Sequence, residues 1–278
     1  MFSGRTLLIV TKHGKEEIFL PLFKDSLGVE CILASSFDTD KLGTFTGEVE
    51  RQGDALATIR RKCHEALALY GCDMAIASEG SFGPHPAFAF GAADDELVMF
   101  IDTLNQLEII ARELSMDTNF NGSKIETEGQ LEEFLSQVGF PKHAVIIRSQ
   151  EGSASGIIKG INDHERVRTI AQDYLTAFGS FYIETDMRAM NNPKRMMVIE
   201  KAAQKLLDKI KSLCPECQTP GYGITDAKQG LTCILCGNAT SSTLSYVYSC
   251  AKCDFQDEVL YPRGKKQEDP MYCNFCNP

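Results

Sequence analysis

The chain has 278 residues, of which 43% are hydrophobic and 24% are charged, with a formal net charge of −10. This balance is typical of a folded globular protein and excludes a disordered chain and a membrane protein. The acidic composition also argues against nucleic acid as a partner, because nucleic-acid binding needs a positive field along the phosphates. The early apolar run Leu7–Val10 is too short for a signal peptide or a membrane span, so we expect a cytoplasmic protein.

The first half of the chain alternates strand-like and helix-like segments. Apolar runs predict strands at residues 7–10, 29–33, 73–77, 97–101 and 107–111. A first helix-like stretch ends before Gly28. The clearest helix runs from Asp54, its N-cap, to Tyr70, with Gly71 as its C-terminal stop. The polar runs 78–86 and 94–96 are expected to be a loop and a turn.

The second half continues the alternation up to the first cysteine pair. We expect helices at residues 128–138, 163–178 and 193–213, and strands at 144–148 and 181–185. Strands that alternate with helices predict an α/β layered domain with a mixed sheet over residues 1–212. A small zinc-ribbon-like module is expected over residues 213–278.

Eight of the eleven cysteines form four Cys-x-x-Cys pairs in this C-terminal module. One such pair presents two thiolates to a metal ion, and two pairs complete a tetrahedral zinc site, so we predict two structural zinc ions. A catalytic dithiol or an iron–sulfur centre is the alternative interpretation of these pairs. Sequential pairing is the simplest arrangement and gives tandem zinc ribbons. An interleaved arrangement, first pair with third and second with fourth, fits the spacings nearly as well. The predicted ligands are Cys214, Cys217, Cys233, Cys236, Cys250, Cys253, Cys273 and Cys276.

The charge of this module bears on its partners. Residues 213–278 contain five Lys and Arg against seven Asp and Glu, a net charge of −2. Each four-thiolate zinc centre adds a formal −2, which takes the module to about −6. This charge argues against nucleic-acid binding and favours a structural role or a protein partner.

Polar groups follow two of the predicted strands, where α/β proteins commonly place ligands. The loop after the first strand contains Thr11, Lys12, His13 and Lys15, which suit a phosphate at a helix N-terminus or form a solvated turn. Glu79 comes directly after an apolar strand, where a carboxylate is costly without a partner or metal. We therefore expect Lys15 and Glu79 to face one cleft, where Mg²⁺ links Glu79 to a bound phosphate. Alternatively, Glu79 caps the following turn.

Further candidates lie between Lys15 and Glu79 along the chain, and others lie near the end of this domain. Glu48 and Glu50 could hold Mg²⁺, and Arg60 on the following helix could contact phosphates. His85 stands between two prolines and either binds ligand or caps its turn. Arg188 and Arg195, which follow the last predicted strand, are candidates for binding a phosphate or a base edge.

Two resemblances add expectations. Over nearly its whole length the sequence resembles a bacterial family of unknown function with C-terminal zinc ribbons. The resemblance rests on residues 11–15, 43–48, 77–86, 184–188 and the four cysteine pairs. Over residues 1 to about 200, the order of motifs is similar to that of the inosine/xanthosine triphosphatases. Thr11 and Lys15 match their first loop, and Glu79-Gly80 matches the acidic residue and glycine at the end of a strand.

The second resemblance is looser elsewhere. Glu48, Glu50, Gly53, Ala55 and Arg60 correspond loosely to the glutamate-bearing segment and helix of that family, and Arg188 and Arg195 are approximate counterparts of its base-contacting residues. The usual asparagine of the first loop and the late His-Arg pair are absent here. The resemblance implies a Mg²⁺-dependent nucleoside triphosphate pyrophosphatase.

Three functional hypotheses follow. The first is a zinc-containing, metal-dependent nucleotide phosphohydrolase, in which Mg²⁺ on Glu79 and on Glu48 or Glu50 polarises phosphate while Lys15 and Arg60 offset its charge. The second is a non-enzymatic nucleotide or small-ligand binding protein whose zinc module contacts a partner protein. The third is an RNA-acting protein that uses the zinc module as a clamp. The substrate, oligomeric state and physiological partner stay open at this stage.

Overall fold

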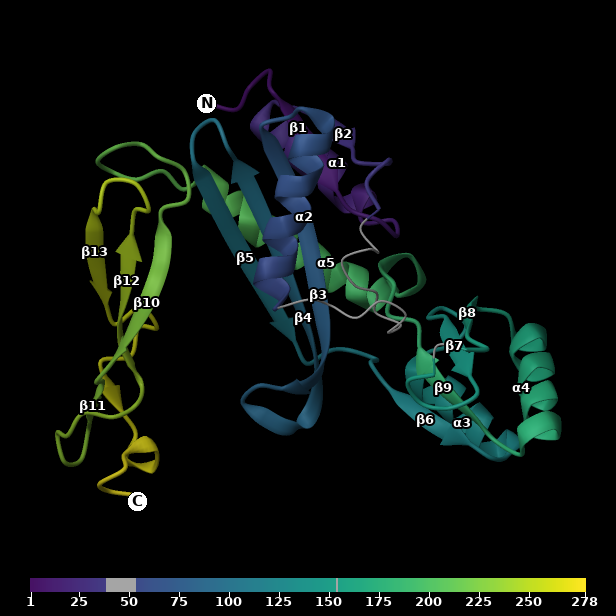
Figure 1. Ribbon diagram of the computed structural model, residues 1–278. Helices are drawn as coiled ribbons and strands as arrows, with labels where there is room; N and C mark the ends of the chain where they lie inside the picture. The colour runs from purple at the N-terminus through teal and green to yellow at the C-terminus, as the bar shows by residue number, and fades with distance from the viewer. Residues whose placement is uncertain (39–53, 154) are drawn as a thin grey trace. The chain divides into compact units, whose positions relative to one another are not determined.

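The computed structural model describes residues 1–38, 54–153 and 155–278. These residues form two compact units, Met1–Leu207 and Asp208–Pro278. We call them the α/β unit and the cysteine unit and describe each by itself (Figure 1). No helix in the described part of the chain is long and apolar enough to cross a membrane.

The α/β unit is built on a five-stranded mixed sheet. Strand β1 (Thr6–Val10) lies between β2 (Glu30–Leu33) and β3 (Met74–His85) and is parallel to both. Strands β4 (Phe88–Asp102) and β5 (Leu107–Ser115) continue the sheet in antiparallel fashion, which gives the order β2-β1-β3-β4-β5. The predicted α/β class with a mixed sheet is therefore confirmed.

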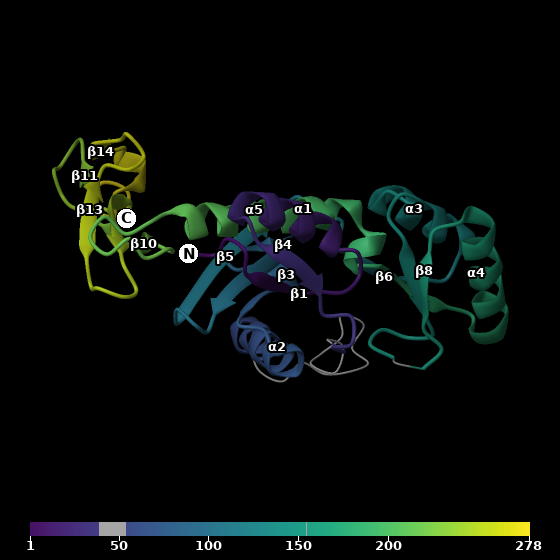
Figure 2. The same ribbon diagram turned by 90° about the horizontal axis from the view of Figure 1, so that it is seen from above.

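Helices cover both faces of this sheet. Helices α1 (Glu16–Leu27) and α5 (Pro193–Lys211) lie on one face, and α2 (Ala55–Tyr70) lies on the other (Figure 2). The side chains between α2 and the sheet exclude water and form one apolar core, which supplies the main driving force for this layer. The buried members of this core are Leu8, Val10, Ala34, Ile59, Cys63, Ala66, Leu67, Ala75, Ala77, Met99 and Ile101.

The helix ends follow from their capping residues. The Asp54 side chain accepts a hydrogen bond of 2.6 Å from the backbone N–H of Ala57, which satisfies one of the free donors at the start of α2. Gly28 and Gly71 end α1 and α2 with φ values of 64° and 65°, in the left-handed region that glycine adopts most easily. The predicted ends of these two helices are confirmed.

A second, antiparallel sheet completes the α/β unit, with the order β6-β9-β7-β8. Helices α3 (Glu128–Val138) and α4 (His164–Phe178) pack on one of its faces around Leu131, Phe134 and Val167. The strands are β6 (Gly122–Ile125), β7 (Val145–Arg148), β8 (Ile158–Ile161) and β9 (Phe181–Thr185).

The cysteine unit contains two small sheets. An antiparallel sheet has the order β10-β12-β13, and a two-stranded parallel sheet joins β11 to β14. Apart from four of the cysteines, the buried hydrophobic side chains among its described residues are Ile210 and Leu231. Such a core is too small to hold a fold of this size, so we expect bound metal to supply the missing stability. Its elements are β10 (Gly223–Gln229), β11 (Thr232–Cys233), β12 (Thr243–Ser249), β13 (Gln256–Leu260), β14 (Gln267–Glu268) and the 3₁₀ helix η3 (Pro270–Tyr272).

Candidate functional site

The eight paired cysteines gather into two groups of four, and within each group the sulfur atoms all lie within 4.8 Å of one another. The first pair joins the third, and the second joins the fourth. The sequential pairing that would give tandem zinc ribbons is therefore wrong, and the interleaved alternative is correct. The groups are Cys214, Cys217, Cys250 and Cys253, and Cys233, Cys236, Cys273 and Cys276.

The strand pairing explains this interleaving. Gly223 at the start of β10 lies opposite Ser249 at the end of β12, so the pair that precedes β10 meets the pair that follows β12. The parallel pairing of β11 with β14 likewise places Cys233 beside Glu268, shortly before the fourth cysteine pair. Sequence spacing alone does not contain this information, because it depends on which strands share a sheet.

The geometry of both groups suits zinc. Tetrahedral Zn–S bonds of about 2.3 Å place neighbouring sulfur atoms about 3.8 Å apart. The sulfur atoms of Cys214 and Cys253 are 3.6 Å apart, and those of Cys233 and Cys276 are 3.9 Å apart. All eight cysteines are free of disulfide bonds. The two groups could therefore hold two zinc ions, and four protein ligands each would make the sites structural, since no position is left for water.

A second polar feature lies in the α/β unit, where six ionisable side chains are buried close together. We call this set the charged cluster. Its members come from five different parts of the fold, and removing so many charges from water costs several kcal/mol per ion before pairing offsets it. The members, with their exposed fractions, are Lys15 (5%), Lys62 (8%), Glu79 (4%), Asp94 (1%), Glu96 (0%) and Arg195 (1%).

The centre of the cluster is an ion pair between α5 and β4. Arg195 Nε lies 2.6 Å from Glu96 Oε1, and the guanidinium group also donates to the backbone carbonyl of Met187. Gly80, the register partner of Glu96 on β3, lies directly beneath this pair. A Cβ at Gly80 would stand 2.4 Å from Glu96 Oε1 and 2.6 Å from an Arg195 nitrogen, so a larger residue there would displace the ion pair.

Two further members of the cluster have strongly shifted pKa values. Lys15 Nζ donates to Ser78 Oγ at 2.9 Å, and burial, followed by the charge of Arg195, lowers the pKa of Lys15 to about 7. Burial, followed by the charge of Glu96, raises the pKa of Asp94 to about 8. One oxygen of Asp94 and one of Glu96 are buried without a hydrogen-bond partner among the described residues.

The remaining members, Lys62 and Glu79, form an ion pair on the α2 side of the sheet. The run 78–86, expected to be a loop, continues β3, and successive residues of a strand point to opposite faces. Ser78 and Lys15 therefore lie on the face that α1 and α5 cover, while Glu79 lies on the α2 face. The charge of Glu79 nevertheless acts on Lys15 and favours its charged form, so the shared cleft of Lys15 and Glu79 stays a prediction.

Several candidates from the sequence lie outside the cluster. Lys12 pairs with Asp38 at 2.5 Å. Arg60 forms a partly exposed ion pair with Glu108 of β5 at 2.6 Å. His85 accepts a hydrogen bond from the backbone N–H of Ala87 at 3.1 Å, so it fits the turn-capping alternative.

The first loop and the segment after β9 complete the set of candidates. Thr11 Oγ1 is buried without a hydrogen-bond partner among the described residues, and His13 has a φ of 68°. Arg188 lies three residues after the end of β9, where the fully buried Asp186 accepts a hydrogen bond of 2.9 Å from its Nε. Glu48 and Glu50 lie outside the described residues.

The sequence reasoning missed three members of the cluster, although signals for them exist. Asp94 and Glu96 alternate with outward residues on β4 and share a face with the buried Val98, which marks them as inward-facing. The residue Lys62 lies three positions after the buried Ile59, and so belongs to the apolar face of α2. Both signals were missed because residues 94–96 were interpreted as a turn and Lys62 as a solvated residue.

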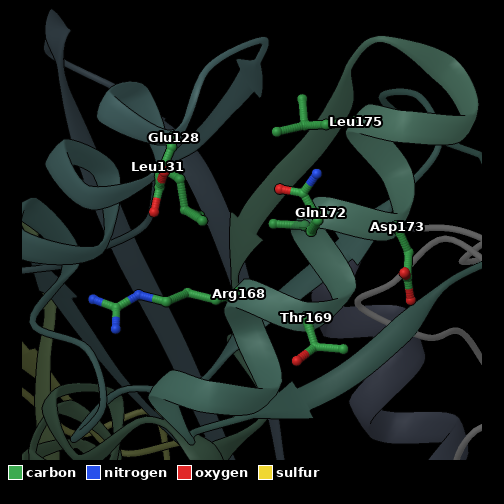
Figure 3. Close-up of a pocket in the computed structure, with 8 residues that line it drawn as sticks. Glu128, Leu131, Arg168, Thr169, Gln172, Asp173 and Leu175 are labelled. Atoms are coloured by element: carbon green, nitrogen blue, oxygen red, sulfur yellow. The ribbon is translucent and has the colours of Figure 1, made fainter.

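A hollow of about 360 Å³ lies between α3 and α4 (Figure 3). Leu131 and Ala171 are its buried lining residues, and Arg168 reaches toward α3, where it pairs with Glu132 at 2.8 Å. Both partners are about half exposed, and such surface pairs contribute little free energy. This hollow lacks a buried charge, so the charged cluster is the better candidate site.

Comparisons with curated proteins and with solved structures find no match, so the resemblance to inosine/xanthosine triphosphatases stays a hypothesis. A family model matches residues 62–278, which include every member of the charged cluster except Lys15, and all eight paired cysteines. This match covers well over half of the chain. The chain therefore belongs to the family described as Domain of unknown function (DUF6671).

Proposed function

We propose that the α/β unit binds a phosphorylated small molecule of the nucleoside triphosphate class at the charged cluster, and that the cysteine unit is a structural two-zinc module. The burial of three cations and three carboxyl groups beside the end of β1 is the observation that supports this proposal. Ionisable groups with strongly perturbed pKa values concentrate at functional sites, because burial that costs stability is retained where it serves binding or chemistry.

Lys15 and Arg195 are the cations that suit a phosphate best. Lys15 contacts Ser78 and Arg195 contacts Glu96, which point to the same face of the sheet, and the charge of Arg195 opposes protonation of Lys15. A phosphate between them would relieve this repulsion and favour the charged amine. Lys15 also stands at the N-terminus of α1, where the helix dipole favours an anion.

Magnesium would then enter with the nucleotide. Among the described residues, the cysteine groups are the sets of three or more His, Cys, Asp or Glu side chains that could hold a metal ion. Mg²⁺ commonly binds through substrate phosphates and one or two carboxylates, so it does not need a complete protein site. Glu79 is the described carboxylate that the proposal assigns to it, and hydrolysis would release pyrophosphate from the nucleotide.

A specific observation also favours binding without hydrolysis. Glu79 is held by Lys62 and Glu96 by Arg195, so each carboxylate would have to exchange a strong ion pair for metal contact. If these pairs persist in the complex, the protein binds a nucleotide but does not cleave it. The two forms of the proposal differ only in turnover.

Calorimetric titration with ATP, GTP, ITP and XTP in the presence of Mg²⁺ tests the binding site. For whichever nucleotide binds, we expect Lys15→Ala to raise Kd at least about tenfold, which corresponds to about 1.4 kcal/mol. Lys24→Ala, an exposed position on the same helix, is the matched control and should leave Kd unchanged. Absence of binding for every nucleotide, or equal effects of both variants, would overturn the proposal.

Pyrophosphate release under the same conditions separates the enzymatic and the binding forms. If the protein hydrolyses the nucleotide, we expect Glu79→Gln to abolish turnover while the nucleotide still binds. Full turnover in Glu79→Gln would show that the assigned metal ligand is wrong. Binding without pyrophosphate release in the unmodified protein would favour the non-enzymatic form.

A further inference from the structure

The cysteine unit exposes a group of large apolar side chains around its second cysteine group. Three of them lie inside the two Cys-x-x-Cys turns, and the other two lie in η3, directly before the last pair. We call these residues the knuckle patch. Its members, with their exposed fractions, are Ile234 (64%), Leu235 (72%), Met271 (60%), Tyr272 (56%) and Phe275 (72%).

The first cysteine group serves as an internal comparison. Its turns contain Pro215 and Glu216 in one pair and Ala251 and Lys252 in the other, all of them exposed. A Cys-x-x-Cys turn in this unit therefore folds without large apolar residues between its cysteines. The apolar side chains of the knuckle patch are therefore not needed to form such a turn.

The two turns lie close together because both belong to one cysteine group. The sulfur atoms of Cys236 and Cys273 are 3.6 Å apart, which brings the Ile234-Leu235 turn beside the turn that contains Phe275. The backbone N–H of Ile234 also donates to Glu268 O at 3.0 Å, close to η3. Apolar residues scattered singly over a surface need no explanation, but five large ones gathered around one cysteine group are typical of a contact site.

We propose that the knuckle patch is a self-association surface, at which two copies of this chain meet around a twofold axis. Side chains of this size that are more than half exposed contribute roughly 100 Å² each, or about 500 Å² per copy and about 1,000 Å² for the pair. This area reaches the lower limit of specific interfaces. A twofold contact uses the same patch on both copies, so one patch per chain is sufficient.

This inference is independent of nucleotide binding. Analytical ultracentrifugation of the zinc-loaded full chain should show a reversible monomer–dimer equilibrium, because interfaces at the lower size limit belong to weak complexes. The variant with Leu235→Ser and Phe275→Ser removes the two most exposed apolar side chains and should be monomeric at every concentration examined.

Two controls keep the result interpretable. The variant with Glu216→Ser and Lys252→Ser changes the corresponding turns of the other cysteine group and should dimerise like the unmodified chain. Zinc content should be the same in all three proteins, which shows that the variants retain both metal sites. A monomeric unmodified chain at high micromolar concentration, or a Leu235→Ser/Phe275→Ser variant that dimerises normally, would refute the proposed interface.

Discussion

At the scale of single residues, the ion pair of Arg195 with Glu96 is the strongest constraint on the charged cluster. Both side chains are fully buried, so each must be neutralised by the other. A buried pair of this kind is often no more stabilising than well-packed apolar residues, but removal of one partner leaves an uncompensated charge. The ion pair therefore depends on the space that the surrounding backbone leaves for it, and on Gly80 in particular.

We expect Gly80→Ala to lower the free energy of unfolding by about 2 kcal/mol or more, because its Cβ would occupy space that Glu96 and Arg195 fill. Gly83→Ala is a matched control on the same strand, since a Cβ there would meet no atom within 4 Å. Urea unfolding of the two variants measures the difference. Equal effects would show that the ion pair can shift at little cost.

A second residue-scale prediction concerns pH. Because Asp94 has a pKa of about 8 instead of 3.8, the folded protein keeps a proton between these pH values that the unfolded chain has released. The contribution of Asp94 to stability therefore falls as the pH rises through this range. Asp94→Asn mimics the protonated form, so we expect the variant to gain stability relative to the unmodified protein by more than about 1 kcal/mol as the pH rises.

Urea unfolding of both proteins at a series of pH values between about 4 and 8 measures this gain. The charges around Asp94 include Glu96, Arg195 and Lys15, and all three are present in both proteins. Lys15 contributes an opposite trend above pH 7, since its lowered pKa makes the unfolded chain the better proton binder there. Parallel stability curves for the two proteins would mean that Asp94 titrates normally.

At the scale of elements, local signals decided what could be predicted from the sequence. Helix α2 was predicted correctly because Asp54 and Gly71 mark its ends chemically. Strands β6 and β8 escaped prediction because each is short and contains a glycine and a lysine. Their pairing with β9 and β7 is a long-range interaction, which a local pattern does not reveal.

The candidate site was predicted in part for a related reason. Lys15, Glu79 and Arg195 were identified because each follows a strand or opens a helix, and the structure buries all three. The face of the sheet to which Glu79 points depends on where β3 ends. Because β3 continues through Gly80, Glu79 points to the opposite face of the strand from Ser78, the residue that accepts a hydrogen bond from Lys15.

An element-scale prediction concerns the start of α3. Thr127 accepts a hydrogen bond from the backbone N–H of Gln130, whose side chain in turn accepts from the backbone N–H of Thr127. This capping box satisfies two donors that a helix otherwise leaves free. We expect Thr127→Ala to cost about 1 kcal/mol of unfolding free energy, measured by urea unfolding. Ser136→Ala, exposed in the same helix, should cost almost nothing.

At the scale of the whole molecule, the two units obtain their stability differently. The α/β unit has extended apolar cores on both of its sheets, whereas the cysteine unit has few buried apolar side chains besides its cysteines. We expect a strong chelator to unfold the cysteine unit and to leave the α/β unit folded, because metal binding supplies the folding free energy of the former alone. Hydrogen exchange followed residue by residue distinguishes the two units, and equal loss of protection in both would contradict this expectation.

The interleaved pairing makes a sharper prediction about double variants. Each intact group of four thiolates should bind one Co²⁺ or Zn²⁺ ion, so a variant should lose one ion for each group that it damages. Cys214→Ser with Cys250→Ser damages one group and should retain one tetrathiolate site per chain. Cys214→Ser with Cys233→Ser damages both groups and should retain none. Sequential pairing would reverse these outcomes, because the first and second pairs would then share an ion. The intensity of the Co²⁺–thiolate absorption and elemental zinc analysis count the intact sites, with the unmodified chain as the two-ion reference.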